Sequence, residues 1–235
     1  MIRAAAVLVF LGLYVPAASL VGLPLAHLMR SPAVLYTLGR FGIGVALMLS
    51  GTRVVVEGRE NLGDTRNTVV MPNHVSHLDA PVLFQSLRID FKAVAKTEIF
   101  KIPFLAHVLR FAGFIEVDRA DRTQSRAALD RAARSLREGH CFLIFPEGTR
   151  TRTGELGPFK RGAFVAAIEA GSRIVPAALQ GTGELMPRGR FRIRPGTVRL
   201  RLLEPVAAGA YSYDDRERLA SDVRTRIAAA LAESA

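Results

Sequence analysis

The sequence is poor in several residue types whose presence marks particular protein classes. Its 235 residues include one cysteine, Cys141, and no tryptophan. A single cysteine excludes an internal disulfide and a zinc site built from several cysteines. Because Cys141 opens the apolar run 141–145, we expect a small buried side chain rather than a reactive thiol. There is also no internal repeat and no linker rich in proline or serine.

Acidic residues are absent from residues 1–50, whose only full charges are three arginines. The stretch 4–29 is long enough to cross a bilayer, which takes about 20 apolar residues, and 32–50 is a second apolar stretch. Three interpretations remain open: a cleaved signal peptide, a transmembrane hairpin, and a hairpin half inserted in one leaflet. Because an arginine at the centre of a bilayer is costly, Arg40 favours an interfacial position.

The chain as a whole is strongly basic, with a formal net charge of +11. Such a charge favours an anionic partner: a nucleic acid, an anionic membrane surface or a phosphorylated substrate. We find no recognised nucleic-acid motif, and the tyrosines do not alternate with the basic residues. Four arginines at alternating positions, Arg188, Arg190, Arg192 and Arg194, predict either a cationic strand face or a solvated edge strand guarded by charge.

Beyond residue 50, short apolar runs alternate with amphipathic stretches, as is typical of an α/β domain. We therefore expect a membrane-associated helical hairpin over 1–50 and an α/β domain over 51–235, with a largely buried sheet between helices. The expected strands are Val54–Glu57, Thr68–Pro72, Ala93–Ala95, Ile115–Asp118, Cys141–Phe145, Ile174–Leu179 and Val198–Leu203. The expected helices are Thr123–Glu138, Gly162–Ala170 and Tyr213–Leu231.

The stretch Asn-His-Val-Ser-His-Leu-Asp, residues 73–79, follows one of these strands and places two imidazoles near a carboxylate. His74 and Asp79 are too far apart around a regular helix to meet, but a turn followed by a helix start can join them. Asp79 alternatively caps the helix that begins near Pro81. A metal site is a weaker interpretation, because the remaining histidines are scattered along the chain and no acidic cluster accompanies them.

Two further strands end in arginines. Phe-Pro-Glu-Gly-Thr-Arg, residues 145–150, follows an apolar strand and offers backbone amides, a hydroxyl and a guanidinium to an anion. Gly-Phe-Ile-Glu-Val-Asp-Arg, residues 113–119, closes another strand. Taken alone, 145–150 is more often a turn with a surface arginine than a site, and 113–119 is compatible with a strand closed by a surface ion pair, which contributes little to stability.

In their order and spacing these stretches, together with Ile-Val-Pro-Ala-Ala-Leu at 174–179, resemble the four motif blocks of the glycerolipid acyltransferases. The pattern is most similar to that of the bacterial 1-acylglycerol-3-phosphate acyltransferases. The resemblance extends to Lys-Thr-Glu-Ile-Phe-Lys-Ile-Pro, residues 96–103, and to Phe-Lys-Arg-Gly-Ala, residues 159–163. It implies a sheet-centred α/β domain behind an N-terminal two-helix membrane element.

The resemblance also implies roles for individual residues. His74 is the expected general base and Asp79 its orienting partner, whereas His77 is not a motif position. No metal and no cofactor is expected. The residues expected to bind the acceptor phosphate are Arg119, Glu147, Gly148, Thr149 and Arg150, with Lys96 as an additional contact.

The implied reaction transfers an acyl group from acyl-CoA or acyl-carrier protein to the sn-2 hydroxyl of 1-acylglycerol-3-phosphate, giving phosphatidic acid. The implied partners are membrane lipids, the lysophosphatidate acceptor and the donor, without nucleic acid. The implied location is the bacterial inner membrane, with the catalytic domain facing the cytoplasm. Alternatives are an acyltransferase for a lyso-ornithine lipid or another lysophospholipid, a non-enzymatic basic protein that binds membrane or nucleic acid, and a metal hydrolase.

Overall fold

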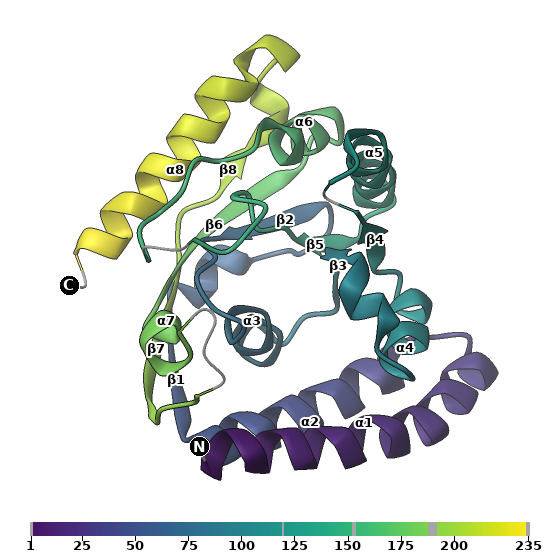
Figure 1. Ribbon diagram of the computed structural model, residues 1–235. Coiled ribbons are helices and arrows are strands. Elements are labelled where there is room, and N and C mark those ends of the chain that lie inside the picture. The colour runs from purple at the N-terminus through teal and green to yellow at the C-terminus, as the bar shows by residue number, and fades with distance from the viewer. Residues whose placement is uncertain (1, 119, 152–153, 188–191, 234–235) are drawn as a thin grey trace.

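The structure, a computed structural model, describes residues 2–118, 120–151, 154–187 and 192–233 (Figure 1). Its strands are β1 (Thr52–Glu57), β2 (Thr68–Pro72), β3 (Phe91–Lys96), β4 (Ile115–Val117), β5 (Cys141–Leu143), β6 (Arg173–Gln180), β7 (Gly196–Leu202) and β8 (Val206–Ala207). Its α-helices are α1 (Ile2–Met29), α2 (Ala33–Ser50), α3 (Asp79–Leu87), α4 (Leu105–Phe111), α5 (Arg122–Arg137), α6 (Arg161–Glu169), α7 (Thr182–Leu185) and α8 (Arg216–Ala232). The 3-10 turns are η1 (Arg59–Leu62), η2 (Thr97–Lys101), η3 (Ala208–Ala210) and η4 (Tyr213–Asp215).

The strands form one mixed sheet in the order β1-β7-β6-β2-β5-β3-β4, with β8 paired to β6. Five strands, β6, β2, β5, β3 and β4, run parallel to their neighbours in this row, and β7 is antiparallel to β6. The carboxyl ends of these five strands therefore share one edge of the sheet. Ligands of open α/β sheets bind at such an edge.

Helices cover both faces of the sheet, as the apolar strands predict. Alternate residues of β2 point to opposite sides: Val70 packs with α3, whereas Val69 and Met71 pack with α5, α6 and α8. Figure 1 shows α5, α6 and α8 on one side of the sheet, and α3 with the pair α1 and α2 on the other. The α/β architecture predicted from the sequence is confirmed.

Helix α2 makes polar contacts with the rest of the molecule. The hydroxyl of Tyr36 donates to the backbone oxygen of Phe91 at 2.9 Å. Arg40 forms an ion pair with Asp90, and its guanidinium lies 5.7 Å from the centre of the Tyr36 ring. Arg40 therefore has partners within the fold, and its charge does not by itself require an interfacial position.

Both N-terminal helices are apolar and long enough to cross a membrane, and α1 leaves most of its surface uncovered. Leu13 and Leu28, for example, are largely exposed. These properties are compatible with membrane association. The division into a membrane hairpin over 1–50 and a separate domain over 51–235 stays a prediction.

The strand predicted over the alternating arginines is not found at the positions that the structure describes. Arg192 and Arg194 lie in an irregular segment before β7, and Arg188 and Arg190 lie outside the described residues. The backbone N–H of Arg194 donates to the carbonyl of Leu185 at the end of α7, 2.8 Å away. This bond directs the segment toward α7 instead of the sheet, so the predicted cationic strand face is wrong for Arg192 and Arg194.

Candidate active site

The loop that follows β2 is fixed at its start by Asn73. The side-chain oxygen of Asn73 accepts from the backbone N–H of Leu179 at 2.7 Å, and its nitrogen donates to the Leu179 carbonyl at 2.9 Å. Asn73 is buried, and the amide satisfies a backbone pair of β6 as a neighbouring strand would. Asn73 thereby holds the start of the loop against β6.

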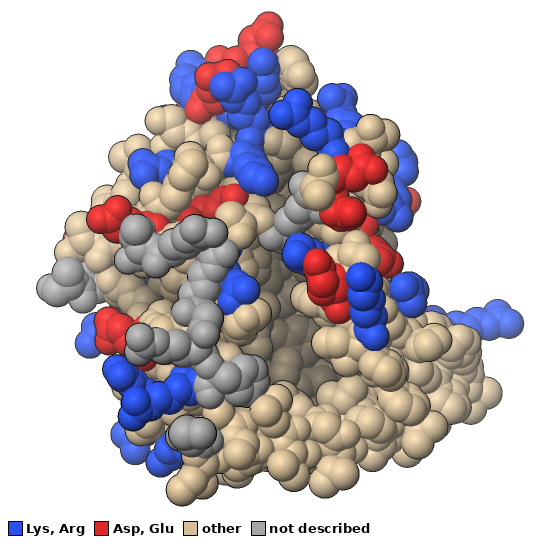
Figure 2. All heavy atoms as spheres, in the orientation of Figure 1, with Lys and Arg blue, Asp and Glu red and all other residues tan. Residues whose placement is uncertain are grey.

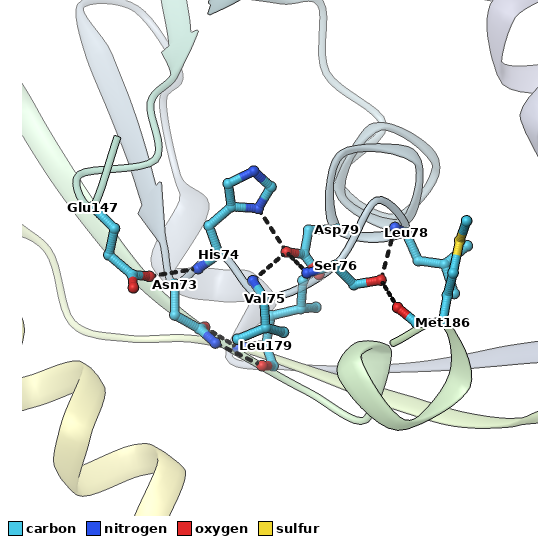
Figure 3. Close-up of polar contacts among 9 residues, drawn as sticks. All are labelled: Asn73, His74, Val75, Ser76, Leu78, Asp79, Glu147, Leu179 and Met186. Atoms are coloured by element: carbon cyan, nitrogen blue, oxygen red, sulfur yellow. Dashed lines mark hydrogen bonds and ion pairs between the residues drawn. The ribbon is translucent and has the colours of Figure 1, made fainter. Parts of the chain in front are cut away.

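Asp79, fully buried at the start of α3, organises the rest of the loop (Figure 3). Its Oδ2 accepts from His74 Nδ1 at 2.7 Å and from the backbone N–H groups of Val75 and Ser76 at 2.7 and 2.8 Å. A capping carboxylate would accept from N–H groups further along its own helix. The Asp79 side chain turns back to the loop instead, so the interpretation of Asp79 as a mere helix cap is wrong.

The imidazole of His74 is presented between a carboxylate and an aromatic wall. One ring edge faces Asp79, and Figure 3 shows Nε2 directed away from the loop. The ring stacks on Phe145, with centroids 3.9 Å apart, and its side chain is 15% exposed. No hydrogen bond to Nε2 is made by any residue the structure describes. Nε2 is therefore the ring nitrogen that the fold leaves open to a ligand, as a general base at His74 would require.

Glu147 connects the turn after β5 to the same loop. One of its oxygens accepts from the His74 backbone N–H at 2.7 Å and the other from that of Gly157 at 2.9 Å. Burial raises the pKa of Glu147 above its usual value, and the two N–H donors partly oppose this rise. The carboxylate thus holds the backbone of His74, a contact across 73 positions that the sequence did not predict.

The rest of this turn also lies beside His74. The backbone N–H of Thr151 donates to the His74 carbonyl at 3.0 Å. Gly148 has φ of +70°, and a Cβ added there would lie 2.8 Å from the side chain of Lys160. Only glycine adopts this conformation readily and admits such an approach. The turn that carries Gly148, Thr149 and Arg150 is therefore next to the catalytic histidine predicted from the sequence, with Lys160 beside it.

His77 differs from His74 in its surroundings. Its pKa is lowered by partial burial and then by the positive charge of Arg150. No hydrogen bond joins His77 to Asp79, whose Oδ2 accepts from His74 and two backbone N–H groups. Within this loop the carboxylate selects His74.

The remaining predicted positions lie at the same edge of the sheet or outside the described residues. Lys96 ends β3, where its ammonium forms an ion pair with Glu98 at 2.7 Å. Arg119, which follows β4, is not among the residues that the structure describes. The contacts of Thr149 and Lys96 to an acceptor stay predictions, as does the role of Arg119.

Two neighbours of the loop were missed by sequence reasoning. The Ser76 hydroxyl donates to the Met186 carbonyl at 2.8 Å and accepts from the Leu78 N–H at 3.2 Å, so it ties the loop to the end of α7. The sequence did point to Lys160, because this residue lies in a stretch that carries the family resemblance. Nothing in the sequence pointed to Ser76, since its partner Met186 is 110 positions away.

We predict that Glu147→Gln lowers kcat while leaving the acceptor KM nearly unchanged. Its amide nitrogen would face one of the two backbone N–H donors, which costs about 1–3 kcal/mol of stability and loosens His74. In this size range each kcal/mol lowers Tm by about 2–4 °C. Thermal melting and steady-state kinetics measure both effects, with the exposed Glu169→Gln as control. A raised KM with normal kcat would instead assign Glu147 to acceptor binding.

The pH dependence of this variant has a defined sign. Because the folded-state pKa of Glu147 is raised, its ionisation costs folding free energy as pH rises through that pKa. A glutamine does not titrate, so the stability advantage of the unchanged protein over Glu147→Gln should be larger at mildly acidic pH than at pH 8. Melting at several pH values measures the difference.

Comparisons with known proteins find similar sequences over most of this chain. A family model described as Acyltransferase matches residues 53–180. The 1-acyl-sn-glycerol-3-phosphate acyltransferase of Borreliella burgdorferi is 30% identical over 185 residues, which are 79% of this chain and 74% of that protein. The chloroplastic 1-acyl-sn-glycerol-3-phosphate acyltransferase LPAT1 of Arabidopsis thaliana is 38% identical over 156 residues, 66% of this chain but only 44% of that longer protein.

A solved structure agrees with these matches. The crystal structure of the 1-acyl-sn-glycerophosphate (LPA) acyltransferase PlsC from Thermotoga maritima superposes with a TM-score of 0.80 and 29% sequence identity. The match covers 98% of this chain and 97% of that one, so it includes the two N-terminal helices. The family match covers more than half of the chain and includes the loop of His74 and Asp79. The chain belongs to the acyltransferase family.

Proposed function

We propose that the chain transfers an acyl group from acyl-CoA or acyl-carrier protein to the sn-2 hydroxyl of 1-acylglycerol-3-phosphate, which gives phosphatidic acid. The observation that carries this proposal is the His74–Asp79 pair, in which a fully buried carboxylate holds Nδ1 and leaves Nε2 directed outward. The activity for which the bacterial and plant relatives are named supports the choice of reaction.

In the proposed reaction the acceptor hydroxyl gives its proton to Nε2 of His74 as its oxygen attacks the thioester carbonyl carbon. Asp79 keeps the other ring proton on Nδ1 and stabilises the imidazolium that forms. When the carbon–sulfur bond breaks, the imidazolium returns its proton to the leaving thiolate. The acyl group ends on the acceptor, the donor ends as a free thiol, and His74 is neutral again.

This reaction needs neither a protein nucleophile nor a cofactor. The one cysteine lies buried in β5, and burial raises the pKa of Cys141 to about 12, so it stays a thiol at neutral pH. The acceptor oxygen is itself the nucleophile. In the described part of the chain, no three His, Cys, Asp or Glu side chains lie together as metal ligands.

For the acceptor phosphate we propose the turn at Gly148, Thr149 and Arg150, with Lys160 beside it. A phosphomonoester carries close to two negative charges at neutral pH, which suits the planar fork of an arginine and a nearby ammonium. Lys96, the last residue of β3, is proposed as a further contact, as is Arg119, which comes two positions after β4 in the sequence. Glu147 supports the turn through His74 and Gly157, which accounts for a carboxylate near an anion site.

Replacing Arg150 with alanine should raise the acceptor KM by about 10- to 100-fold, because a charged hydrogen bond contributes roughly 1.5–3 kcal/mol. The donor KM should change little, and Arg150→Lys should recover part of the loss. Arg126→Ala, on the exposed side of α5, is the matched control and should behave as the unchanged protein. Steady-state kinetics that vary each substrate separately test this, and a normal acceptor KM in Arg150→Ala would remove the turn from the phosphate site.

We further propose that α1 and α2 attach the enzyme to the inner face of a bacterial inner membrane. Both candidate donors are cytosolic, so the site at the sheet edge should face the cytoplasm. The net charge of +11 supports this location, since a basic residue near an anionic leaflet contributes about 1 kcal/mol. The signal-peptide alternative predicts a mature chain that begins near Ser19. Mass spectrometry that finds the N-terminus at or next to Met1 would exclude it.

A panel of lysolipid acceptors tests the acceptor. Thiol release from acyl-CoA by the purified protein should be fastest with 1-acylglycerol-3-phosphate. Lysophosphatidylcholine and a lyso-ornithine lipid lack a phosphomonoester. They should react at least tenfold more slowly if the charged contacts to the acceptor phosphate contribute the proposed binding free energy. Equal rates across the panel would favour another lysolipid as the natural acceptor, and no release with any of them would favour a non-enzymatic binding protein.

A further inference from the structure

An exposed apolar segment lies between β3 and α4, outside the site described above. Five large hydrophobic residues beyond residue 50 are exposed in the described part of the chain, and three of them fall within six positions of this segment. They are Ile99, Ile102 and Phe104, which are 39%, 47% and 39% exposed. Soluble surfaces seldom gather such side chains without a partner.

The segment is held in place, so its apolar side chains are presented by a defined backbone. Phe100 is buried between them, and the guanidinium of Arg110 lies 5.3 Å from its ring centre. The Ile102 carbonyl accepts from the N–H of Ala106 at 3.1 Å. Phe104 has φ of +64°, which is unfavourable for a bulky residue. The fold thus holds Phe104 in a costly conformation and still leaves its ring exposed.

The segment continues an apolar surface that begins on α1. Helix α4 lies beside α1 (Figure 1), and the rings of Phe111 and His27 are 4.5 Å apart. The neighbouring end of α1 exposes Leu28 and Met29. Figure 2 shows a broad surface almost free of charged side chains along the side formed by α1 and α2, with a hollow between this surface and the charged part of the molecule.

The charges of the segment match the headgroup layer of a bilayer. Lys101 is exposed directly beside Ile102, and Lys96 at the other end pairs with Glu98. Apolar side chains flanked by lysines are typical of elements that lie in a membrane interface, where the ammonium groups reach the phosphates. A second copy of the chain would not require this combination, and the continuity with α1 favours a bilayer over a protein partner.

We propose that residues 97–104 form a second membrane-contacting element, with Ile102 and Phe104 below the lipid phosphates and Lys101 among them. This inference rests on the proposed membrane association of α1 and α2. Two separate contacts fix the rotation of the domain about the helical pair. The end of β3, and with it the edge of the sheet that carries His74, then faces the lipid surface from which a lysolipid must enter.

Because the chain contains no tryptophan, one introduced tryptophan reports the surroundings of a single position by its fluorescence. Phe104→Trp and Ile102→Trp each place one fluorophore in the segment, and the second leaves the unusual backbone of Phe104 unchanged. Leu13→Trp, on the exposed face of α1, reports the helical pair. Tyr213→Trp is the water-exposed control, since η4 precedes α8 on the opposite face of the sheet. Each full-length variant is reconstituted in vesicles of anionic phospholipid with or without brominated acyl chains.

Brominated lipids should remove most of the fluorescence of Phe104→Trp, Ile102→Trp and Leu13→Trp and little of that of Tyr213→Trp, whereas acrylamide in the water should do the reverse. Quenching of Leu13→Trp alone by bromine would overturn the proposal and leave the helical pair in the membrane. If bromine quenches none of these three variants, the membrane contact of residues 97–104 and the membrane association of α1 and α2 are both contradicted. Protection of the segment reporters from both quenchers would assign the surface to a protein contact instead.

Acyl-transfer assays on the same vesicles separate this inference from the proposed reaction. Bromine quenching at Phe104→Trp without acyl transfer by the unchanged protein would contradict the proposed function while supporting the membrane contact. Acyl transfer by the unchanged protein, combined with segment tryptophans that acrylamide quenches and bromine does not, would support the proposed function and contradict the membrane contact.

Discussion

His74→Ala should lower kcat by about 10²-fold or more, which is the usual scale for the loss of a general base. The folded structure supports a large effect on kcat and a small one on stability. The His74 side chain is held by one hydrogen bond and by the stack on Phe145, whereas the loop itself is fixed by Asn73, Glu147 and Asp79. Steady-state kinetics and thermal melting of the same preparation measure both properties.

His77→Ala is the matched control, because it removes the same ring from the same loop. No hydrogen bond links His77 to Asp79 in the structure, and partial burial, followed by the positive charge of Arg150, lowers the pKa of His77. We expect its kcat to stay within a few-fold of the unchanged protein. A sensitive His77 with a tolerant His74 would show that the base has been assigned to the wrong histidine.

The second large effect is expected for Asp79→Asn, which should lower kcat by about 10²-fold. A single oxygen, Oδ2, accepts all three hydrogen bonds, so an asparagine oxygen in its place can keep the loop bonded. The amide cannot supply the negative charge that stabilises the imidazolium, and a rotated amide would force the wrong tautomer. Losing a charge-assisted bond of roughly 1.5–3 kcal/mol accounts for about 10- to 100-fold, and a tautomer error adds to it.

Stability separates this electrostatic role from a structural one. Oδ1 of Asp79 is buried without a hydrogen-bond partner among the described residues, so an NH₂ group in its place loses no existing bond. We therefore expect Asp79→Asn to melt within a few degrees of the unchanged protein. Full activity in a folded Asp79→Asn variant would show that the carboxylate only shapes the loop.

The strands and the contact between His74 and Asp79 were predictable because their signals are local. Apolar runs such as 68–72 and 174–179 identify buried parallel strands wherever their neighbours lie. The helix start at Asp79 follows from Asp-Ala-Pro, and a turn before it brings His74 to Asp79 over five positions. These contacts depend on few residues, and the same residues carry the resemblance to the family.

The contacts that were missed depend on which strands become neighbours. Glu147 reaches the backbone of His74 because β2 and β5 pair side by side, and their order in the sheet is not written in either segment. The partner of Arg40 was missed for a similar reason, since Asp90 lies 50 positions away. The alternating arginines before β7 follow a strand pattern. At Arg194, however, the backbone N–H bonds to the carbonyl of Leu185 instead of to a neighbouring strand.

The measurement that tests the central claim most directly is product analysis by mass spectrometry. Purified protein and its His74→Ala variant, in equal amounts in vesicles, receive acyl-CoA and 1-acylglycerol-3-phosphate whose acyl chains differ in mass. The proposed mechanism predicts phosphatidic acid that carries the donor chain at sn-2, formed by the unchanged protein and reduced about 10²-fold or more in the variant. Phosphatidic acid formed equally by both proteins, or by neither, would contradict the assignment of acyl transfer to this site.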